Sequence, residues 1–201
     1  MEDRQGNPDP VNDMNFRIFL LSLLLASCAS PHVELYSLDP SIPETASAPL
    51  LPLAIHVGRP KANPGYETPE MAYTTKPHEI RYFLRNRWVA SPSRMLKPVL
   101  EQALSKKFSR IAPTPSSADL ELDTEIVMLR QEFSGHSSRI HLVVRAQVGE
   151  GKARKFDILE PCPGNDPYGG VIAANRAIAR LSAEITQYCE EYVHLRRGRG
   201  S

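Results

Sequence analysis

The stretch LELDTEIVMLRQEFSGHSSRIHLVVRAQVGEGKARKFDIL, residues 120–159, decides the fold because apolar and polar residues alternate along it. Alternation places every second side chain on the same face of a strand. We therefore predict three strands with one apolar face each: Leu120, Leu122, Ile126 and Met128 in the first, Ile140, Leu142, Val144, Ala146 and Val148 in the second, and Phe156 and Ile158 in the third. Glycines and serines at 134–138 and 149–151 predict the turns, so the strands should form an antiparallel meander with one solvated face.

A long helix is predicted after these strands. Asp166 is expected to cap it and Pro167 to occupy its first turn, because both residue types are favoured there. Apolar residues then recur at helical spacing in one stripe: Val171, Ala174, Ile178, Leu181, Ile185 and Tyr188. We expect this stripe to pack on the dry face of the strands, and the basic residues 196–201 to form a flexible tail.

Residues 80–107 predict one further strand and one further helix. Apolar residues alternate with mostly basic ones at the start: Ile80, Tyr82 and Leu84 against Arg81, Phe83 and Arg85. A strand with one apolar and one basic face should result, continuing towards Trp88. The residues Ser91 to Ser93 favour a helix start, and apolar residues follow at helical spacing up to Lys107. Because proline removes a helical hydrogen bond, Pro98 leads us to expect that the helix begins at about residues 95–97.

The segment from Pro31 to Pro69 holds eight of the 18 prolines. Such a composition resists regular structure and favours extended backbone. We expect a stalk here, interrupted by strands at about residues 35–38 and 51–57, and followed by a long structureless loop from Gly58 to Pro69.

A signal segment precedes this stalk. Arg17 is followed by an apolar run, residues 18–25, that is too short to cross a ~30 Å hydrocarbon core as a helix. The sequence LASC at 25–28 resembles the lipobox of bacterial lipoproteins. The resemblance implies cleavage between Ser27 and Cys28, a diacylglyceryl group on the Cys28 thiol and an acyl chain such as palmitate on the new amino group, which together give permanent membrane attachment. The alternative is a buried core segment in which Cys28 is an ordinary small apolar residue.

The ends of this signal carry two further indications. Residues 1–13 are polar and acidic, whereas a conventional signal would begin at Met14, so we interpret Met14 as the true initiator. Ala29 follows the lipobox cysteine; in the Gram-negative lipoproteins that this signal resembles, an aspartate at this position usually retains the protein at the inner membrane. The resemblance therefore implies the periplasmic face of the outer membrane.

Composition excludes several classes of function. With 24 Lys and Arg against 23 Asp and Glu, the chain lacks the net positive charge of nucleic-acid-binding proteins. Cys162 and Cys189 should stay unpaired, with Cys189 packed inside, because they are separated by ~33 Å of predicted helix. The sequence has no serine-hydrolase elbow, no phosphate-binding loop and no zinc-binding spacing, so we expect no catalytic residue, no metal and no cofactor beyond the acyl chains on Cys28.

One set of residues is proposed to contact a partner or lipid: Arg81, Tyr82, Arg85, Arg87, Trp88 and Arg94. Arginine suits lipid phosphates and partner carboxylates, and tryptophan is typical of interfaces. The alternative is that the arginines only solvate an outer face and that Trp88 is a core residue.

The order of elements resembles the auxiliary lipoproteins of ABC-type, MCE-containing intermembrane lipid transport systems, often called PqiC-like. The resemblance rests on Tyr36 and Leu38 soon after Cys28, on Tyr82 and Trp88 within residues 80–92, on Phe108 after the helix at 95–107, and on Phe156, Glu160 and Pro161 before the alanine-rich helix at 173–183. Two features depart from the pattern. Cys162 stands where such chains usually carry an apolar residue, and the irregular segment 61–76 blurs the expected early strands.

The resemblance implies an α/β fold with a mixed, largely antiparallel sheet and two main helices packed on one face, preceded by a signal peptide and a proline-rich stalk. The chain would divide into the signal (1–27), a lipidated linker (28–50), the domain (51–195) and the tail (196–201). Implied partners are an MCE-domain protein, phospholipid and further copies in a homo-oligomeric ring, with the protein as a non-catalytic docking or conduit component. Two alternatives stay open: a stand-alone periplasmic lipid or lipoprotein carrier, and a lipid-modifying enzyme, whose catalytic residues the sequence does not display.

Overall fold

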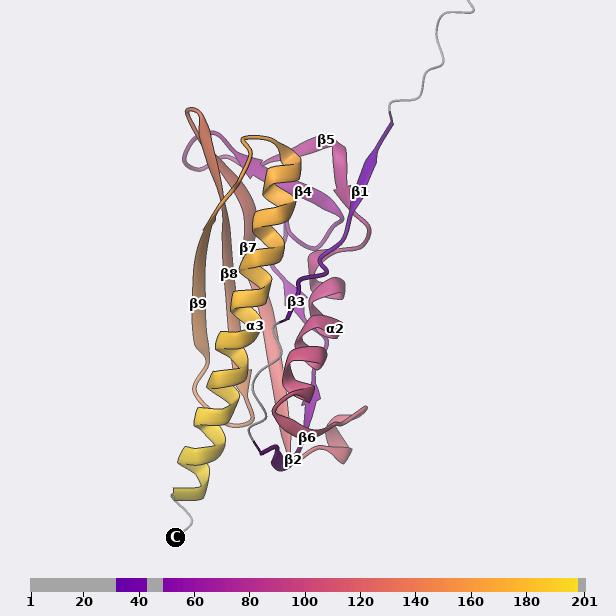
Figure 1. Ribbon diagram of the computed structural model, residues 1–201, viewed down its shortest axis with the longest axis vertical. Coiled ribbons are helices and arrows are strands. Elements are labelled where there is room, and N and C mark those ends of the chain that lie inside the picture. The colour runs from indigo at the N-terminus through magenta and orange to yellow at the C-terminus, as the bar shows by residue number, and fades with distance from the viewer. Residues whose placement is uncertain (1–31, 43–48, 199–201) are drawn as a thin grey trace, which may run out of the picture. The chain divides into compact units, whose positions relative to one another are not determined.

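The computed structural model describes residues 32–42 and 49–198. The signal segment, the cleavage site between Ser27 and Cys28, and the last three residues lie outside this part of the chain, and the predictions about them stay predictions. Residues from Val33 onward form one folded unit, shown in Figure 1.

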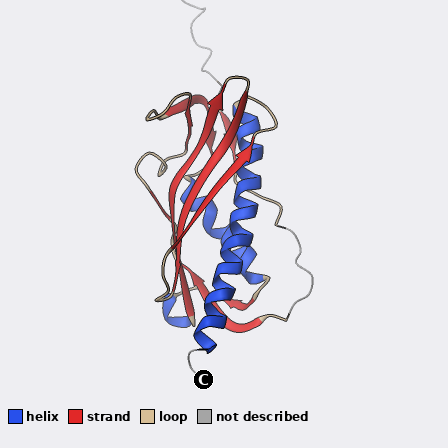
Figure 2. Ribbon diagram, turned by 90° about the vertical axis from the view of Figure 1, so that its left-hand side faces the viewer, coloured by secondary structure: helices blue, strands red, loops and turns tan. Residues whose placement is uncertain are grey.

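The unit combines one curled sheet with two helices. In chain order its elements are β1 (Glu34–Tyr36), β2 (Leu51–Val57), β3 (Lys61–Ala62), β4 (Glu70–Thr74), β5 (Arg81–Trp88), α2 (Pro92–Ser105), β6 (Phe108–Ile111), a 3-10 turn (Pro115–Ser117), β7 (Leu120–Ser134), β8 (Ser137–Val148), β9 (Arg154–Pro161) and α3 (Pro167–Gly198). Both helices lie on the same side of the sheet, as Figure 2 shows. The hydrophobic core fills the space between the two layers.

The predicted meander is confirmed. β7 pairs antiparallel with β8 over twelve positions, and β8 pairs antiparallel with β9. The inner faces of β8 and β9 are the predicted ones, since Leu142, Val144 and Ile158 are buried. This region folds as the alternation of its residues dictates, because each apolar face can be covered by the stripe of α3.

The prediction that Met128 shares the inner face of β7 is wrong. A register shift lies between Ile126, which pairs with Val144, and Met128, which pairs with Val143. The extra residue of this β-bulge exchanges the two faces of the strand beyond it. Leu129 therefore becomes the buried residue, at 3% exposure, in place of Met128, which is only partly buried.

The sheet is mixed, as predicted, and its two longest ladders are antiparallel. Among the described residues, five ladders are parallel (β1–β5, β2–β6, β2–β7, β3–β7 and β4–β7) and three are antiparallel (β4–β5, β7–β8 and β8–β9). β2, β3 and β4 follow one another along the same edge of β7, opposite Leu120, Glu125 and Gln131 in turn. The long β7 is thus the strand on which the N-terminal segment is assembled.

The expectation of a structureless loop from Gly58 to Pro69 is also wrong. β3 lies within it, and both Ala62 and Tyr66 are buried in the core. Prolines interrupt the pairing, so the segment touches β7 only briefly before β4 begins.

The segment expected to be a linker is partly folded. β1 pairs with β5, and Leu38 is buried beside the helices. The Asp39 backbone N–H donates to the Asn175 side-chain oxygen of α3 at 2.7 Å. The folded unit therefore begins well before residue 51, because this short segment covers core that the sheet and helices would otherwise expose.

The helix after β5 begins earlier than predicted. α2 starts at Pro92, and Pro98 lies inside it with its ring exposed to solvent. The four residues around it on the inner face, Met95, Leu96, Val99 and Leu100, are buried. Their burial outweighs the hydrogen bond that Pro98 cannot donate.

The last helix follows the prediction at its start and exceeds it at its end. The Asp166 carboxylate accepts a hydrogen bond from the Gly169 N–H at 2.7 Å, and the predicted apolar stripe is buried. The helix continues to Gly198, so Arg196 and Arg197 belong to it and not to a tail. Both described cysteines are free thiols, as predicted, and burial raises the pKa of Cys189 to about 12.

Candidate functional site

The six residues proposed as a contact surface do not form one cluster. Five of them lie on β5 and Arg94 lies on α2. Trp88 is 4% exposed and belongs to the hydrophobic core. Arg87 is held by Glu70, with 2.6 Å between Nη2 and Oε1, so its charge is already paired.

Two more of the six brace β5 against its neighbours. Arg81 pairs with Glu79 at 2.9 Å. The Tyr82 hydroxyl donates to the Gly65 carbonyl at 3.1 Å. Arg85 and Arg94 remain as the members of the set whose side chains form no ion pair within the described part of the chain.

The predicted apolar face of β5 is exposed to solvent: Ile80, Tyr82 and Leu84 are all exposed. Between Ala72, which pairs with Tyr82, and Glu70, which pairs with Arg87, the register shifts because β5 contributes three more residues than β4. The strand bends outward over this interval. Leu84 is consequently 92% exposed.

The bend of β5 lies beside the start of β1. Glu34 pairs with Asn86 in a parallel ladder, so Val33 lies next to Arg85 and close to Leu84. Leu35 is 61% exposed, and Val33 is exposed as well. We call Val33, Leu35 and Leu84 the apolar corner.

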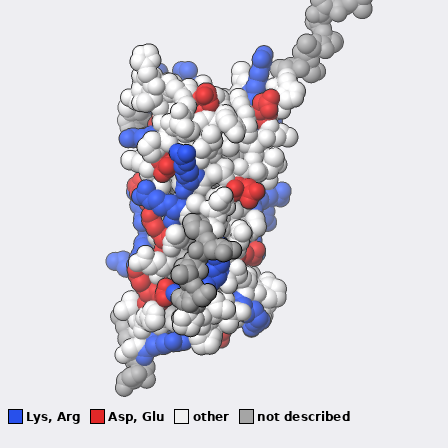
Figure 3. Space-filling model, viewed as in Figure 1, with Lys and Arg blue, Asp and Glu red and all other residues white. Residues whose placement is uncertain are grey.

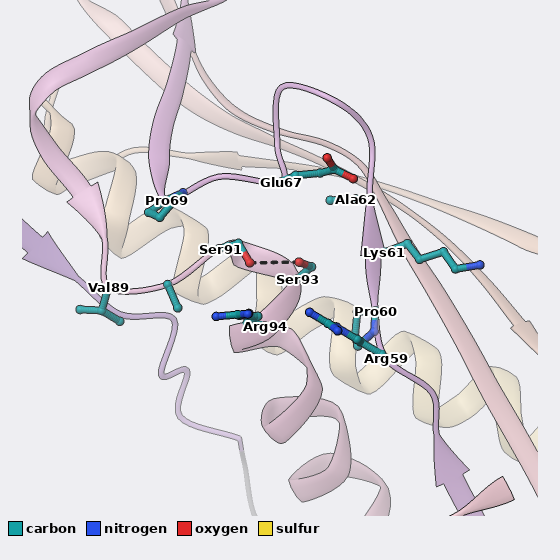
Figure 4. A pocket seen from close by; sticks show the side chains of 11 residues that line it. Arg59, Pro60, Lys61, Ala62, Glu67, Pro69, Val89, Ser91, Ser93 and Arg94 are labelled. Carbon is teal, nitrogen blue, oxygen red and sulfur yellow. Dashed lines mark hydrogen bonds between the residues drawn. The ribbon is translucent and has the colours of Figure 1, made fainter.

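A second surface feature is an open groove of about 620 Å³ at the start of α2. Its walls come from residues 59–62, 67–69 and 89–94, so three separate segments of the chain meet there. Three cationic side chains line it: Arg59, Lys61 and Arg94. Figure 4 shows the side chain of Arg59 extending towards the start of α2, where Arg94 lies. We call these three cations and the space between them the basic groove.

The charges of the basic groove are not neutralised within the described residues. Glu67 lines the same groove, yet neither it nor the three cations takes part in an ion pair there. The helix dipole adds positive potential, because α2 points its N-terminus at the groove. Ser91 and Ser93 hydrogen-bond to each other at 3.2 Å on the same rim. The arrangement suits a carboxylate or phosphate group.

Sequence reasoning included Arg94 but missed Arg59 and Lys61. Both fall in the segment that was expected to be structureless. Only the parallel pairing of β3 with β7 brings them to the start of α2, and no local pattern in the sequence signals a two-residue strand.

The outer face of β7–β9 carries a network of charges. Glu132 accepts hydrogen bonds from Arg130 and Arg139 at 2.7 and 3.0 Å, and its carboxylate lies 3.1 Å from His141 Nδ1. The other ring nitrogen of His141 lies 2.8 Å from Asp157. Partial burial alone would raise the pKa of Glu132, but these hydrogen bonds outweigh it and lower the pKa to about 2.

This network has a structural character. Each of its two carboxylates, Glu132 and Asp157, is hydrogen-bonded to a cationic side chain and to His141. Across the described residues, no three His, Cys, Asp or Glu side chains group in a way that could hold a metal ion. Nor does any helix in the described part of the chain have the length and apolar character needed to span a membrane.

The sequence and the fold are similar to those of known proteins. A family model described as ABC-type transport auxiliary lipoprotein component matches residues 36–186. The crystal structure of protein XCC0632 from Xanthomonas campestris, described with the family model DUF330, is similar with a TM-score of 0.66 and 16% identity, covering 85% of this chain and 97% of that one. The crystal structure of an uncharacterized protein is similar with a TM-score of 0.61 and 16% identity, covering 78% and 98%. No curated protein matches the sequence.

Proposed function

Because this chain belongs to the family of ABC-type transport auxiliary lipoprotein components, we propose that it is an outer-membrane-anchored periplasmic subunit of an MCE-containing, ABC-type intermembrane lipid transport system. The observation that carries the proposal is the family match over residues 36–186, which span nearly the whole described fold. In this role the protein performs no reaction. It docks an MCE-domain protein and helps phospholipid or a similar amphiphile to pass between membranes.

The proposed anchor is Cys28, acylated after cleavage behind Ser27. Metabolic labelling with palmitate should mark the wild-type protein, which should fractionate with the outer membrane. The Cys28→Ser variant should stay unlabelled. Unlabelled wild-type protein recovered from the cytosol would contradict the anchor.

A stand-alone lipid carrier is the weaker alternative, because the inner side of the curled sheet is occupied by the protein's own side chains. A carrier needs an apolar cavity of several hundred Å³. Here the space between the sheet and the helices is filled by side chains with almost no exposure: Ile55, Leu96, Leu104, Leu122, Leu142, Ile178 and Leu181. Native mass spectrometry of the Cys28→Ser protein distinguishes the two, since stoichiometric bound lipid would favour the carrier.

The basic groove is the proposed docking site for an acidic segment of the partner. Its two unpaired arginines, Arg59 and Arg94, line the same groove, so a carboxylate that enters can pair with a cation that has no ion-pair partner within the described residues. Trp88 and Arg87 are left out of this site because the core and Glu70 hold them.

Affinity purification from detergent-solubilised membranes tests this function. The wild-type protein should co-purify with an MCE-domain protein. The double variant Arg59→Glu with Arg94→Glu should co-purify with at least tenfold less of that partner. The matched control is Arg176→Glu, an exposed arginine of α3 outside the groove. If the double variant recovers as much MCE protein as the wild type, the groove is not the docking site. If the wild-type protein recovers no MCE protein, the proposed partner is wrong.

The partner's symmetry motivates the last part of the proposal. A ring-shaped MCE conduit favours a cap with cyclic symmetry, so we expect several copies of this chain to form a ring. Native mass spectrometry of the lipidated protein in detergent should give a single oligomer of defined size. A monomer at every concentration, with and without the partner, would contradict the ring.

A further inference from the structure

The apolar corner exposes leucine where nothing in the described residues covers it. Leu84 is 92% exposed, and Leu35 on the adjoining strand is 61% exposed. Isolated exposed leucines are common, but here three exposed apolar residues come from two paired strands at one corner of the sheet: Val33 and Leu35 in line with Arg85 and Arg87, and Leu84 next to them along β5. The register shift that creates the bend displaces Leu84 away from the core.

The corner lies at the end of the folded unit that the lipid anchor would hold. Val33 follows Cys28 by five positions along the chain, so a fully stretched chain places Val33 at most about 18 Å from the anchor cysteine. The polar layer of one leaflet is roughly 5–8 Å thick. A domain tethered this closely brings its β1 end to the membrane surface.

The charges around the corner are compatible with a lipid surface. Arg85 follows Leu84 directly and forms no ion pair within the described residues. Its guanidinium could reach headgroup phosphates while its stem packs on apolar surface. Glu34 lies between Val33 and Leu35, so the corner has no net positive charge and its contact must be mainly apolar. On the face in Figure 3, the end beside β1 carries more uncharged surface than the middle of the molecule.

We propose that the apolar corner inserts into the leaflet that holds the acyl chains of Cys28, with Leu84 below the headgroups. This inference rests on the proposed lipidation of Cys28. It orients the domain, because the end of α3, which Figure 1 places far from β1, then points away from the anchoring membrane. The opposite end thereby becomes available to an assembly that approaches from the periplasm.

A pair of labelled variants tests the orientation. Full-length lipidated protein is reconstituted in phosphatidylethanolamine and phosphatidylglycerol vesicles after Leu84→Cys or Leu195→Cys substitution, in a Cys162→Ser background. Leu195 is the matched control, since it is a 67% exposed leucine in the last turns of α3. Cys189 is fully buried and stays unlabelled. A polarity-sensitive fluorophore on each cysteine is then exposed to brominated lipid.

The expected result is strong quenching, at least threefold, of the probe at 84 and no quenching of the probe at 195. Equal, weak quenching at both positions in protein that floats with the vesicles would overturn the orientation and leave the anchor intact. Failure of the protein to float would instead refute the lipidation on which both proposals rest. A blue shift at 84 that needs high protein concentration and is insensitive to brominated lipid would overturn the proposal in favour of a contact between copies.

Discussion

The sheet has two lateral halves, its two sides, which consist of different strands and are built differently. On one side β7, β8 and β9 form long antiparallel ladders, and α3 covers their inner face. On the other side β1 to β5 join their neighbours by brief pairings of two or three residue pairs each, which are parallel except between β4 and β5. The unpaired arginines and the exposed leucines described above belong to this second side and to the start of α2. The difference teaches that the long ladders supply the scaffold, whereas the short strands present groups to other molecules.

The largest expected effect lies in the scaffold. Leu142→Ala removes a fully buried side chain from the middle of β8. The lost burial and the remaining cavity should lower the free energy of unfolding by about 2–5 kcal/mol. Urea denaturation measures the loss.

Leu84→Ala, on the other side of the sheet, is the matched control for Leu142→Ala. The side chain is 92% exposed, so in the absence of a membrane its removal should change the free energy of unfolding by less than about 0.5 kcal/mol. Equal losses in the two variants would mean that the short strands contribute as much stability as the long ladders, which is opposite to this account.

The charge network of the scaffold should make stability depend on pH. The carboxyl of Glu132 has a pKa of about 2 in the folded protein against 4.5 for the ordinary group. A lowered pKa means that the stabilisation is fully present above about pH 4.5 and is lost as the pH falls towards 2. Glu132→Gln should cost about 1–3 kcal/mol at pH 7, and its difference from the wild type in urea denaturation should shrink at pH 3. A difference that does not change with pH would refute this role for Glu132.

A smaller effect is expected at the start of α3. Asp166→Ala removes the carboxylate that accepts the Gly169 N–H, and losses of this kind cost about 1 kcal/mol. Thermal unfolding should show a lower midpoint. Asp166→Asn should restore most of the stability because its amide oxygen can accept the same hydrogen bond, and equal behaviour of the two variants would argue against capping.

A smaller effect again is expected for an ion pair on the side with brief pairings. Glu70→Gln breaks the ion pair with Arg87, in which both side chains are more than one third exposed. Solvent screens such pairs, so the free energy of unfolding should fall by less than about 1 kcal/mol. A loss as large as that of Glu132→Gln would erase the contrast between the two sides.

The same contrast explains how much of the fold the sequence could predict. Residues 120–198 follow local rules, since alternation fixes the strands and helical spacing fixes α3. There are two exceptions. Met128 is one, because the run IVML at 126–129 is apolar throughout and hides which residue bulges. The end of α3 is the other, because it continues through Arg196 and Arg197, beyond the apolar stripe. β3 and β4 pair with residues of β7 that are 58 or more positions away, so their placement on that strand depends on contacts that no local pattern records.

The candidate surfaces were less predictable for the same physical reason. Arg94 could be proposed from its residue type, but Arg59 joins it only through the pairing of β3 with β7. Trp88 and Arg87 looked equally suitable, and only the packed structure reveals that the core holds one and Glu70 the other. Leu84 was predicted only to share an apolar face with Ile80 and Tyr82, and the alternation gives no sign of the register shift in β5.

Site-specific photo-crosslinking in intact cells tests the central claim most directly. A photoreactive amino acid is placed at position 59 in the basic groove or at position 145, an outward-facing residue of β8 on the scaffold. The account predicts a crosslink to an MCE-domain transport protein from position 59 and none from position 145. Crosslinks to that protein from position 145 alone, or from neither position in membrane-anchored protein, would contradict it.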